Sequence, residues 1–265
     1  MIDVQGRPDD RGVHLEQVGV SQLRYPIAVL DREQAKQSTV AELTMSVGLP
    51  HHFKGTHMSR FIEVLEENRG EVTMHTIPQI LRRMLKHLEA DTARLEVRFP
   101  YFMRRSAPIT GASGLIDYQC CFIGTSAAGA NDFILSVRVP VTSLCPCSKE
   151  ISDYGAHNQR GYIDLSVRTV PSADQQFEFV WIEELIEVAE RSASSPVYPL
   201  LKRADERHVT MQAYDHPVFV EDMVRNVALE LRADRRIRWF RIRAENHESI
   251  HNHNAFAETS WTRSE

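Results

Sequence analysis

The alternation of apolar and polar positions predicts strands and helices in an order that occurs twice along the chain. In the first half, the pattern predicts strands at 18–30 and 39–48, helices at 58–68 and 77–89, and strands at 94–104 and 115–124. In the second half, it predicts strands at 132–142 and 161–170, helices at 181–191 and 217–232, and strands at 236–244 and 255–261. Each half therefore runs strand, strand, helix, helix, strand, strand.

The repeated order predicts an α+β protein built from two tandem modules. The first would span residues 1–128 and the second 129–265, joined by the small residues at 126–131. Helices that accompany antiparallel strands usually cover one face of the sheet. A single larger α+β domain is the alternative, because the two halves share little sequence identity. Pro26 cannot donate to a strand ladder, so it predicts a sheet edge or a bulge in the first strand.

Composition and charge exclude several classes of protein. The 265 residues are 42% hydrophobic and carry a formal net charge of -5, which argues against an indiscriminate nucleic-acid binder but allows a local basic site for an anionic small molecule. No apolar run approaches the roughly 18–20 residues of a membrane span, and the polar start MIDVQGRPDD lacks the apolar core of a secretory signal. We therefore expect a soluble cytoplasmic protein without a nucleic-acid or membrane partner.

The densest chemistry lies in the segment LCPCSKEISDYGAHNQRG, residues 144–161. Cys145 and Cys147 flank one proline, a spacing that fits structural zinc sites poorly, and Cys120 and Cys121 are adjacent in a predicted strand and so point to opposite faces. His157 follows across a glycine-containing loop and could fold back beside the cysteines. A thiolate, an imidazole and a carboxylate would suit a catalytic metal with an open position. Inert thiols and a loop histidine are the equally weighted alternative.

Two further segments carry acidic and histidine side chains. Glu206 lies in the charged run KRADER, and Glu221 precedes Arg225 by four residues, so a solvated charge cluster and a surface ion pair are the simplest interpretations. The segment ENHESIHNHNAFAE, residues 245–258, lies between the last two predicted strands, where loops often carry function. Its glutamates and histidines favour ring recognition or proton transfer over a plain polar hairpin.

These segments together resemble the type IB GTP cyclohydrolases. The matching stretches are FKGTHMSRF, LCPCSKEISDYGAHNQRG, YPLLKRADE, FVEDMVR and ENHESIHNHNAF, in that order and at similar spacing. The resemblance implies the tunnelling fold (T-fold), with two tandem modules that each hold a four-stranded antiparallel sheet and two helices on one face. It also implies a homotetramer with active sites between subunits. The implied reaction converts GTP and water to formate and 7,8-dihydroneopterin triphosphate, which leads to folate-type pterins and to deazaguanine bases.

The resemblance also implies the ligands of a divalent metal. They are Cys145, His157 and Glu206, and this mixed set suits zinc, manganese or iron(II). Two positions depart from the family pattern, which has proline where Ala204 stands and an acidic residue where Met211 stands. Neither departure touches the implied ligands, so we expect modest consequences.

The same resemblance implies the groups that act on the substrate. Cys147 would be the catalytic thiol, Glu221 would act near the metal-bound water, and His251 would assist proton transfer. Glu248 would hold the guanine edge, because a carboxylate can accept from both N1–H and the exocyclic amine. The candidates for binding the triphosphate are all basic: Lys54, Arg60, Lys149, Arg160, Lys202 and Arg203.

Two alternatives remain open from the sequence. One is another T-fold enzyme acting on a purine or pterin, such as an archaeal-type cyclohydrolase that forms a cyclic phosphate product. The other is a non-enzymatic interaction module in which the cysteines hold zinc structurally, which would unfold on chelation.

Overall fold

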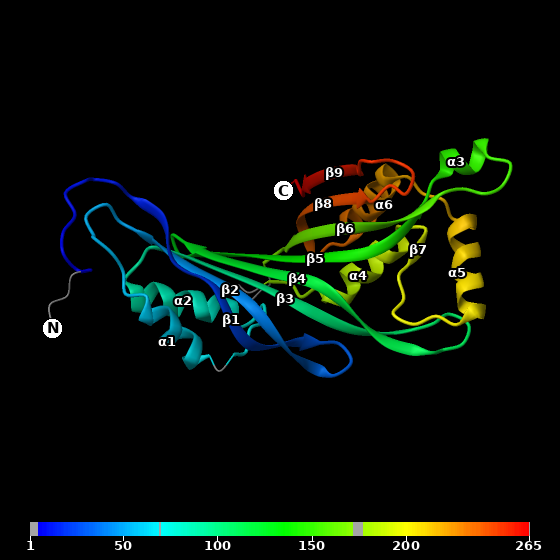
Figure 1. The fold of residues 1–265 in the computed structure, drawn as a ribbon. Coiled ribbons are helices and arrows are strands. Elements are labelled where there is room, and N and C mark those ends of the chain that lie inside the picture. Colours follow the sequence, from blue (N-terminus) through cyan, green and yellow to red (C-terminus); the bar gives the residue numbers. More distant parts are fainter. Residues whose placement is uncertain (1–4, 69, 172–176, 265) are drawn as a thin grey trace. The chain divides into compact units, whose positions relative to one another are not determined.

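The computed structural model describes residues 5–68, 70–171 and 177–264, which contain six helices and nine strands (Figure 1). The helices are α1 Ser59–Glu67, α2 Ile77–Leu88, α3 Pro146–Ile151, α4 Ile182–Arg191, α5 Arg203–Asp215 and α6 Val220–Ala233. The strands are β1 Leu15–Asp31, β2 Ala35–Leu49, β3 Thr92–Ser106, β4 Ser113–Ala127, β5 Ala130–Leu144, β6 Asn158–Thr169, β7 Ser195–Pro196, β8 Ile237–Asn246 and β9 Ala255–Thr262. All twelve predicted elements are confirmed to within a few residues, and α3, β7 and α5 are additions.

The predicted tunnelling fold with two tandem four-stranded modules is wrong. The strands follow one another in the order β1-β2-β3-β4-β5-β6-β8-β9, and β7 pairs with β5 off this path, so one sheet holds nine strands. The reason lies at residues 128 and 129, which the sequence pattern indicates as a linker. Ala128 and Gly129 have φ of 50° and 80°, the left-handed pair that a tight two-residue hairpin turn requires. This turn joins β4 directly to β5, so the two halves share one sheet.

Two compact units interleave along the chain. The first comprises Met1–Pro100, Cys121–Leu135 and Pro171–Phe177, and the second comprises Tyr101–Cys120, Ser136–Val170 and Glu178–Glu265. The proposed division into domains at 1–128 and 129–265 stays a prediction. None of the helices in the described ranges is long and apolar enough to cross a membrane.

The core of the first unit forms between a long hairpin and two helices. Strands β1 and β2 pair antiparallel along most of their length. Pro26 belongs to β1, the first strand in the sheet order, and lies opposite Val40 of β2. Pro26 therefore stands on an edge strand, as predicted, where its missing N–H removes no ladder bond. Helices α1 and α2 pack on each other and bury apolar side chains: Phe61, Val64, Leu65, Ile77, Ile80, Leu81 and Met84.

The core of the second unit forms between β6, β8 and helix α6. Strands β6, β8 and β9 pair antiparallel, with Leu165 opposite Ile242 and Val167 opposite Phe240. These four side chains are fully buried or nearly so. Helix α6 packs against β8 and β9, and α4 packs against α6 (Figure 1). Strand periodicity thus sends every second side chain of β6 into the core beneath the helices.

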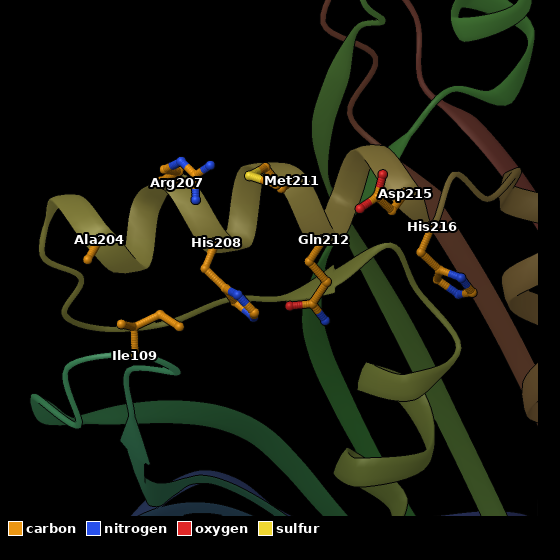
Figure 2. Close-up of a pocket in the computed structure, with 8 residues that line it drawn as sticks. All are labelled: Ile109, Ala204, Arg207, His208, Met211, Gln212, Asp215 and His216. Carbon is orange, nitrogen blue, oxygen red and sulfur yellow. The ribbon is translucent and has the colours of Figure 1, made fainter.

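Helix α5 is built differently, because its described side chains bury only Asp205 and Ala213. A cavity of about 550 Å³ runs along it and extends to Ile109 in the turn between β3 and β4. Figure 2 shows His208, Gln212 and His216 on the side of α5 where Ile109 lies. The helix therefore presents polar and titratable groups to an open space rather than an apolar stripe to a core.

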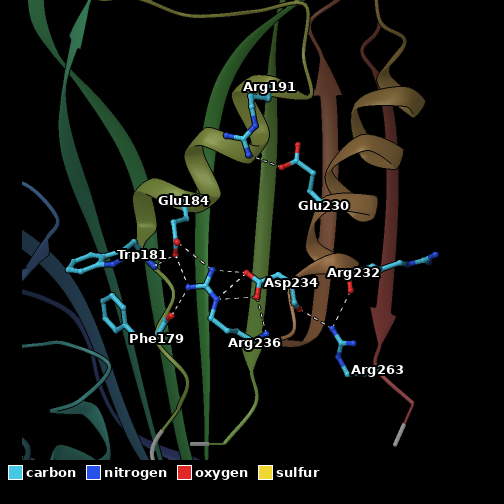
Figure 3. Close-up of polar contacts among 9 residues, drawn as sticks. All are labelled: Phe179, Trp181, Glu184, Arg191, Glu230, Arg232, Asp234, Arg236 and Arg263. Carbon is cyan, nitrogen blue, oxygen red and sulfur yellow. Dashed lines mark hydrogen bonds and ion pairs between the residues drawn. The ribbon is translucent and has the colours of Figure 1, made fainter.

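A charged cluster around Arg236 fastens the start of α4 to the turn between α6 and β8 (Figure 3). The guanidinium donates to Asp234 Oδ2 at 2.7 Å and to Glu184 Oε2 at 3.1 Å, and it reaches the carbonyl oxygen of Phe179 at 3.0 Å. Glu184 also accepts from the backbone of Trp181 at 2.9 Å, which caps α4. One arginine thus joins two helix ends through charge-assisted hydrogen bonds.

Candidate active site

The two cysteines of the Cys-Pro-Cys segment have different environments. Strand β5 ends at Leu144, and Pro146 occupies the first turn of α3, where a proline removes no helical hydrogen bond. Cys145 is half-buried and its Sγ accepts from the backbone N–H of Ser148 at 3.4 Å. Cys147 is exposed. The segment therefore holds one sulfur at the helix cap and leaves the other facing solvent.

The loop after α3 folds back so that His157 lies beside Cys145. The backbone N–H of Cys145 donates to the carbonyl oxygen of His157 at 3.1 Å, and the N–H of His157 donates to Ser148 Oγ at 3.1 Å. These two bonds fix both ends of the loop without using the thiol of Cys145 or the imidazole. The thiol and the imidazole therefore keep their own, separate contacts.

The imidazole of His157 is oriented by two neighbours. Its Nδ1 lies 2.7 Å from Gln159 Oε1 and 3.9 Å from Glu248 Oε2. In a neutral imidazole, donation from Nδ1 to this amide oxygen would leave the lone pair on Nε2, the nitrogen that could then bind a metal. The side chains of His157 and Glu248 are only 13% and 12% exposed, so this imidazole and carboxylate meet in a sheltered place.

Glu248 and His251 lie in the loop between β8 and β9. The loop starts where β8 pairs with the beginning of β6, and the N–H of His247 donates to the carbonyl oxygen of Arg160 at 2.9 Å. His251 is exposed and stacks on His253, with ring centroids 5.1 Å apart. The loop therefore offers one sheltered carboxylate and a pair of exposed imidazoles.

Glu206 lies on the exposed side of α5, next to a buried aspartate. Asp205 is fully buried, and it accepts from the N–H groups of Ile109, Thr110 and Lys202 at 2.9 Å and from the Thr110 hydroxyl at 2.6 Å. Burial raises the pKa of Asp205, but these hydrogen bonds outweigh it and hold the pKa well below the usual range. Asp205 thereby fixes the first turn of α5 against the β3–β4 turn.

The three implied metal ligands do not form a cluster within one chain. Among residues 5–68, 70–171 and 177–264, no group of three or more histidine, cysteine, aspartate or glutamate side chains is arranged to hold a metal ion. Cys145 and His157 are adjacent, whereas Glu206 belongs to the exposed surface of α5. Glu221 is likewise exposed, in the first turn of α6. The chain thus joins the backbones of Cys145 and His157, and Glu206 is not part of a metal-holding group with them.

The basic side chains implied to bind phosphate differ in how free they are. Lys149 donates to the carbonyl oxygen of Tyr214 at 2.5 Å, and Arg60 donates to the carbonyl oxygen of His87 at 2.7 Å. Lys54, Arg160, Lys202 and Arg203 are exposed. Lys54 and Arg60 belong to the first unit and the others to the second. On α5, Arg207 and His208 line the cavity of Figure 2 and were not singled out by the sequence pattern.

Comparison with known proteins identifies relatives along almost the whole chain. The family described as type I GTP cyclohydrolase folE2 matches residues 1–257. The chain is 51% identical to GTP cyclohydrolase FolE2 of Magnetococcus marinus, over 97% of this chain and 94% of that one. It is 52% identical to GTP cyclohydrolase FolE2 of Geobacter sulfurreducens, over 97% and 96%.

Solved structures give the fold. The uricase of Arthrobacter globiformis superposes with a TM-score of 0.55 at 8% sequence identity, covering 94% of this chain and 93% of that one. The urate oxidase of Bacillus subtilis superposes with a TM-score of 0.53 at 10% identity, covering 94% and 99%. At such low identity the similarity concerns architecture alone. It agrees with the single nine-stranded sheet and not with two separate four-stranded modules.

The relatives also decide the family. The sequence-based assignment to the GTP cyclohydrolases is confirmed, but the type IB subtype is replaced by the family that matches. The chain belongs to the type I GTP cyclohydrolase folE2 family.

Proposed function

We propose that the protein is a hydrolase that converts GTP and water to formate and 7,8-dihydroneopterin triphosphate, the first step toward folate-type pterins. The family match along residues 1–257 supports the activity. The observation that carries the assignment within the molecule is the position of His157, whose carbonyl oxygen accepts from the backbone N–H of Cys145 at 3.1 Å and whose Nδ1 lies 3.9 Å from Glu248 Oε2. GTP is a cytoplasmic metabolite, so we propose that the enzyme acts there.

Cys145 and His157 would hold a divalent transition metal, and zinc, manganese and iron(II) all accept this mixture of donors. The 2.7 Å contact between His157 Nδ1 and Gln159 Oε1 supports this assignment, because it would leave Nε2 to the metal. A bound metal would supply a hydroxide nucleophile at neutral pH. Cys145→Ala and His157→Ala are each expected to lower bound metal per subunit and to abolish turnover. Full metal content in either purified variant would remove that residue from the site.

Glu248 would recognise the guanine edge. Guanine presents N1–H and the exocyclic amine as adjacent donors, and one carboxylate accepts both. The low exposure of Glu248 supports this role, because a hydrogen bond to a charged group is stronger away from bulk water. Adenine lacks this pair of donors, so Glu248→Gln should lose preference for GTP over ATP as well as rate.

Proton transfers would use groups that solvent reaches before the substrate binds. Cys147, exposed on α3, would exchange a proton with the ring being opened. Glu221 and His251 would move protons during opening and rearrangement of the ribose. The triphosphate would be held by basic groups drawn from Lys54, Arg60, Arg160, Lys202 and Arg203. Arg207 and His208 extend the basic surface along the cavity on α5.

Glu206 would reach the metal from a second copy of the chain, within a homotetramer. Its separation from Cys145 and His157 in one chain supports this arrangement. Mixing tests it, because Cys147→Ala and Glu206→Gln oligomers would each be inactive alone. After subunit exchange, sites shared between chains would regain up to about a quarter of wild-type activity, since the two chains meet at random. Sites confined to one chain would regain none, and an active monomer would also contradict the arrangement.

The direct experiment is incubation of the purified protein with GTP and each candidate metal, followed by detection of formate and of the pterin product. Formate with 7,8-dihydroneopterin triphosphate is the expected outcome. A cyclic phosphate product would assign the chain to a different cyclohydrolase reaction. Unchanged GTP with all three metals would reject the proposal.

A further inference from the structure

A buried chain of hydrogen bonds runs beneath the candidate active site. Asn246 donates through Nδ2 to Ser143 Oγ at 3.0 Å, and Ser143 donates its hydroxyl proton to the carbonyl oxygen of Val218 at 2.9 Å. Ser143, Asn246 and Val218 are 1%, 3% and 6% exposed. These groups are shielded from bulk solvent, so the bonds are made within a low-dielectric interior, where they are strong and directional.

Each member of this chain stands just before a residue of the proposed site. Ser143 lies near the end of β5, two residues before Cys145, and Asn246 ends β8, two residues before Glu248. Val218 precedes α6 and stands three residues before Glu221. A further bond from the N–H of Val218 to the carbonyl oxygen of Leu144, at 3.2 Å, joins the first and third segments again. Two side chains therefore tie together the three backbone segments that carry a thiol and two carboxylates.

The amide of Asn246 is costly as a merely structural group. Its Oδ1 is buried and has no hydrogen-bond partner among the described residues. A buried acceptor left without a partner destabilises the fold, whereas an apolar side chain of similar size would carry no such cost. Oδ1 also lies 2.5 Å from where a side-chain carbon on Gly161 would stand, so the start of β6 leaves room for this amide. An asparagine at position 246 therefore lowers stability through its unpaired Oδ1, but it supplies the Nδ2 donor to Ser143.

We infer that Ser143 and Asn246 are positioning residues that set the spacing of Cys145, Glu248 and Glu221 for the reaction. The inference rests on the proposed function. Displacement of reacting groups by about 1 Å can cost about 10²-fold in rate, even when the change lies away from the chemistry. Ser143 and Asn246 touch no substrate, and they act through the ends of β5 and β8 and through the segment before α6.

The test compares two serines on the same strand. Ser143→Ala and Asn246→Ala should lower kcat/KM by about 10–100-fold, the usual effect of losing a supporting hydrogen bond in an active site. Ser143→Thr, which keeps the hydroxyl, should retain most of the wild-type kcat/KM. Ser136→Ala is the matched control, because Ser136 also lies on β5 and shares a 2.7 Å hydrogen bond with Ser166, but away from the site. Its activity should stay near wild type.

A double variant separates positioning from general stability. Because both side chains act in one hydrogen-bond chain, Ser143→Ala with Asn246→Ala should lose little more activity than the worse single variant. Gly161→Ala should resemble Asn246→Ala, since its new carbon would displace the amide. If the activity loss of the double variant equals the product of the two single losses, the inference is overturned. Equal activity of Ser143→Ala and Ser136→Ala would also overturn it.

Hydrogen exchange of the backbone amides tests the positioning role independently of the enzyme's activity. Faster exchange at 145–149, 219–222 and 247–250 in Ser143→Ala, with the remainder of the second unit unchanged, is the expected result. A wild-type protein inactive on GTP would reject the proposed function, while this exchange pattern would still decide whether Ser143 orders the three segments. Unchanged exchange in an active enzyme would reject the positioning role alone.

Discussion

Helices α5 and α6 both carry a carboxylate of the proposed site near their first turns, but they are held by different forces. Helix α6 buries one apolar stripe, namely Val220, Met223, Val224, Val227, Ala228 and Leu231. Helix α5 buries only Asp205 and Ala213. Each helix begins with an aspartate that accepts from the backbone of its cap residue, Asp205 from Lys202 at 2.9 Å and Asp222 from Phe219 at 3.3 Å.

The two helices therefore position their carboxylates in different ways. Glu221 is positioned by the hydrophobic core, because α6 packs on β8 and β9. Glu206 is positioned mainly by hydrogen bonds, because the neighbouring Asp205 accepts from four donors and Ala213 is the only other buried side chain among the described residues of α5. A helix that buries so little apolar surface can be stabilised further by a second subunit, which agrees with the proposed role of Glu206 between copies.

The largest expected effect separates the two glutamates by what they bind. Glu206→Gln and Glu221→Gln should each lose about 10²–10⁴-fold in turnover, the range for groups that act in acid–base or metal-assisted steps. Only Glu206→Gln should also lose bound metal, measured per subunit after gel filtration. Equal metal content in both variants would contradict the assignment of Glu206 as a ligand.

Two methionines test the contrast in packing. Met223→Ala, fully buried on α6, should lower the free energy of unfolding by about 2–5 kcal/mol, because it removes apolar contacts and leaves a cavity. Met211→Ala, 46% exposed on α5, should change it by less than about 0.5 kcal/mol in the monomeric chain. Urea unfolding measures both. A large loss for Met211→Ala would mean that α5 is buried in the assembly.

The cluster in Figure 3 gives a smaller, pH-dependent effect. Arg236→Met should lower the free energy of unfolding by about 1–3 kcal/mol at neutral pH, since several charge-assisted hydrogen bonds are lost. Burial raises the pKa of Asp234, but its hydrogen bonds with Arg236 outweigh this and lower the pKa overall. The stabilisation is therefore present above the ordinary aspartate range and is lost as the pH falls through the lowered pKa. The difference in free energy of unfolding between wild type and Arg236→Met should shrink as the pH is lowered. A difference that stays constant with pH would exclude Asp234 as its source.

The smallest expected effect concerns an exposed ion pair between α4 and α6. Arg191 Nη2 lies 2.7 Å from Glu230 Oε2, with side chains 56% and 40% exposed. Such pairs contribute about 0–1 kcal/mol, and salt screens them. Glu230→Gln should therefore barely shift the urea midpoint, and less still in high salt. A shift comparable to that of Met223→Ala would show that polar contacts, and not the core, hold α6.

The sequence pattern predicted the elements that bury an apolar stripe and failed where no such stripe exists. Helix α6 shows apolar residues at helical spacing, so 217–232 was predictable. Helix α5 was missed because its sequence is charged and buries one carboxylate and one alanine. The sequence at 126–131 predicts a linker and not a hairpin turn, because Ala128 adopts a left-handed conformation that usually requires glycine or asparagine. Strand pairing across that turn depends on this local conformation, which periodicity does not encode.

The candidate site was predictable only in part. Cys145, Cys147, His157 and Glu248 stand out by residue type, and family resemblance gives them roles. Gln159, which orients His157, is one of the supporting residues that were not predicted. Such residues are short polar side chains in strands, and their meaning depends on partners far away in the sequence, as when Asn246 bonds Ser143.

The proposed catalytic role of Cys147 is tested by formate release from GTP by wild type, Cys147→Ala and Cys121→Ala. Cys147 is exposed on α3, whereas burial raises the pKa of Cys121 to about 11 and leaves it an unreactive thiol. Cys147→Ala should keep its fold and its metal yet lose about 10²–10⁴-fold in rate, while Cys121→Ala should stay close to wild type. GTP should also protect Cys147 of the wild type from alkylation. Formate release by Cys147→Ala near the wild-type rate would contradict this role, because the thiol of Cys147 would then be only a neighbour of the site.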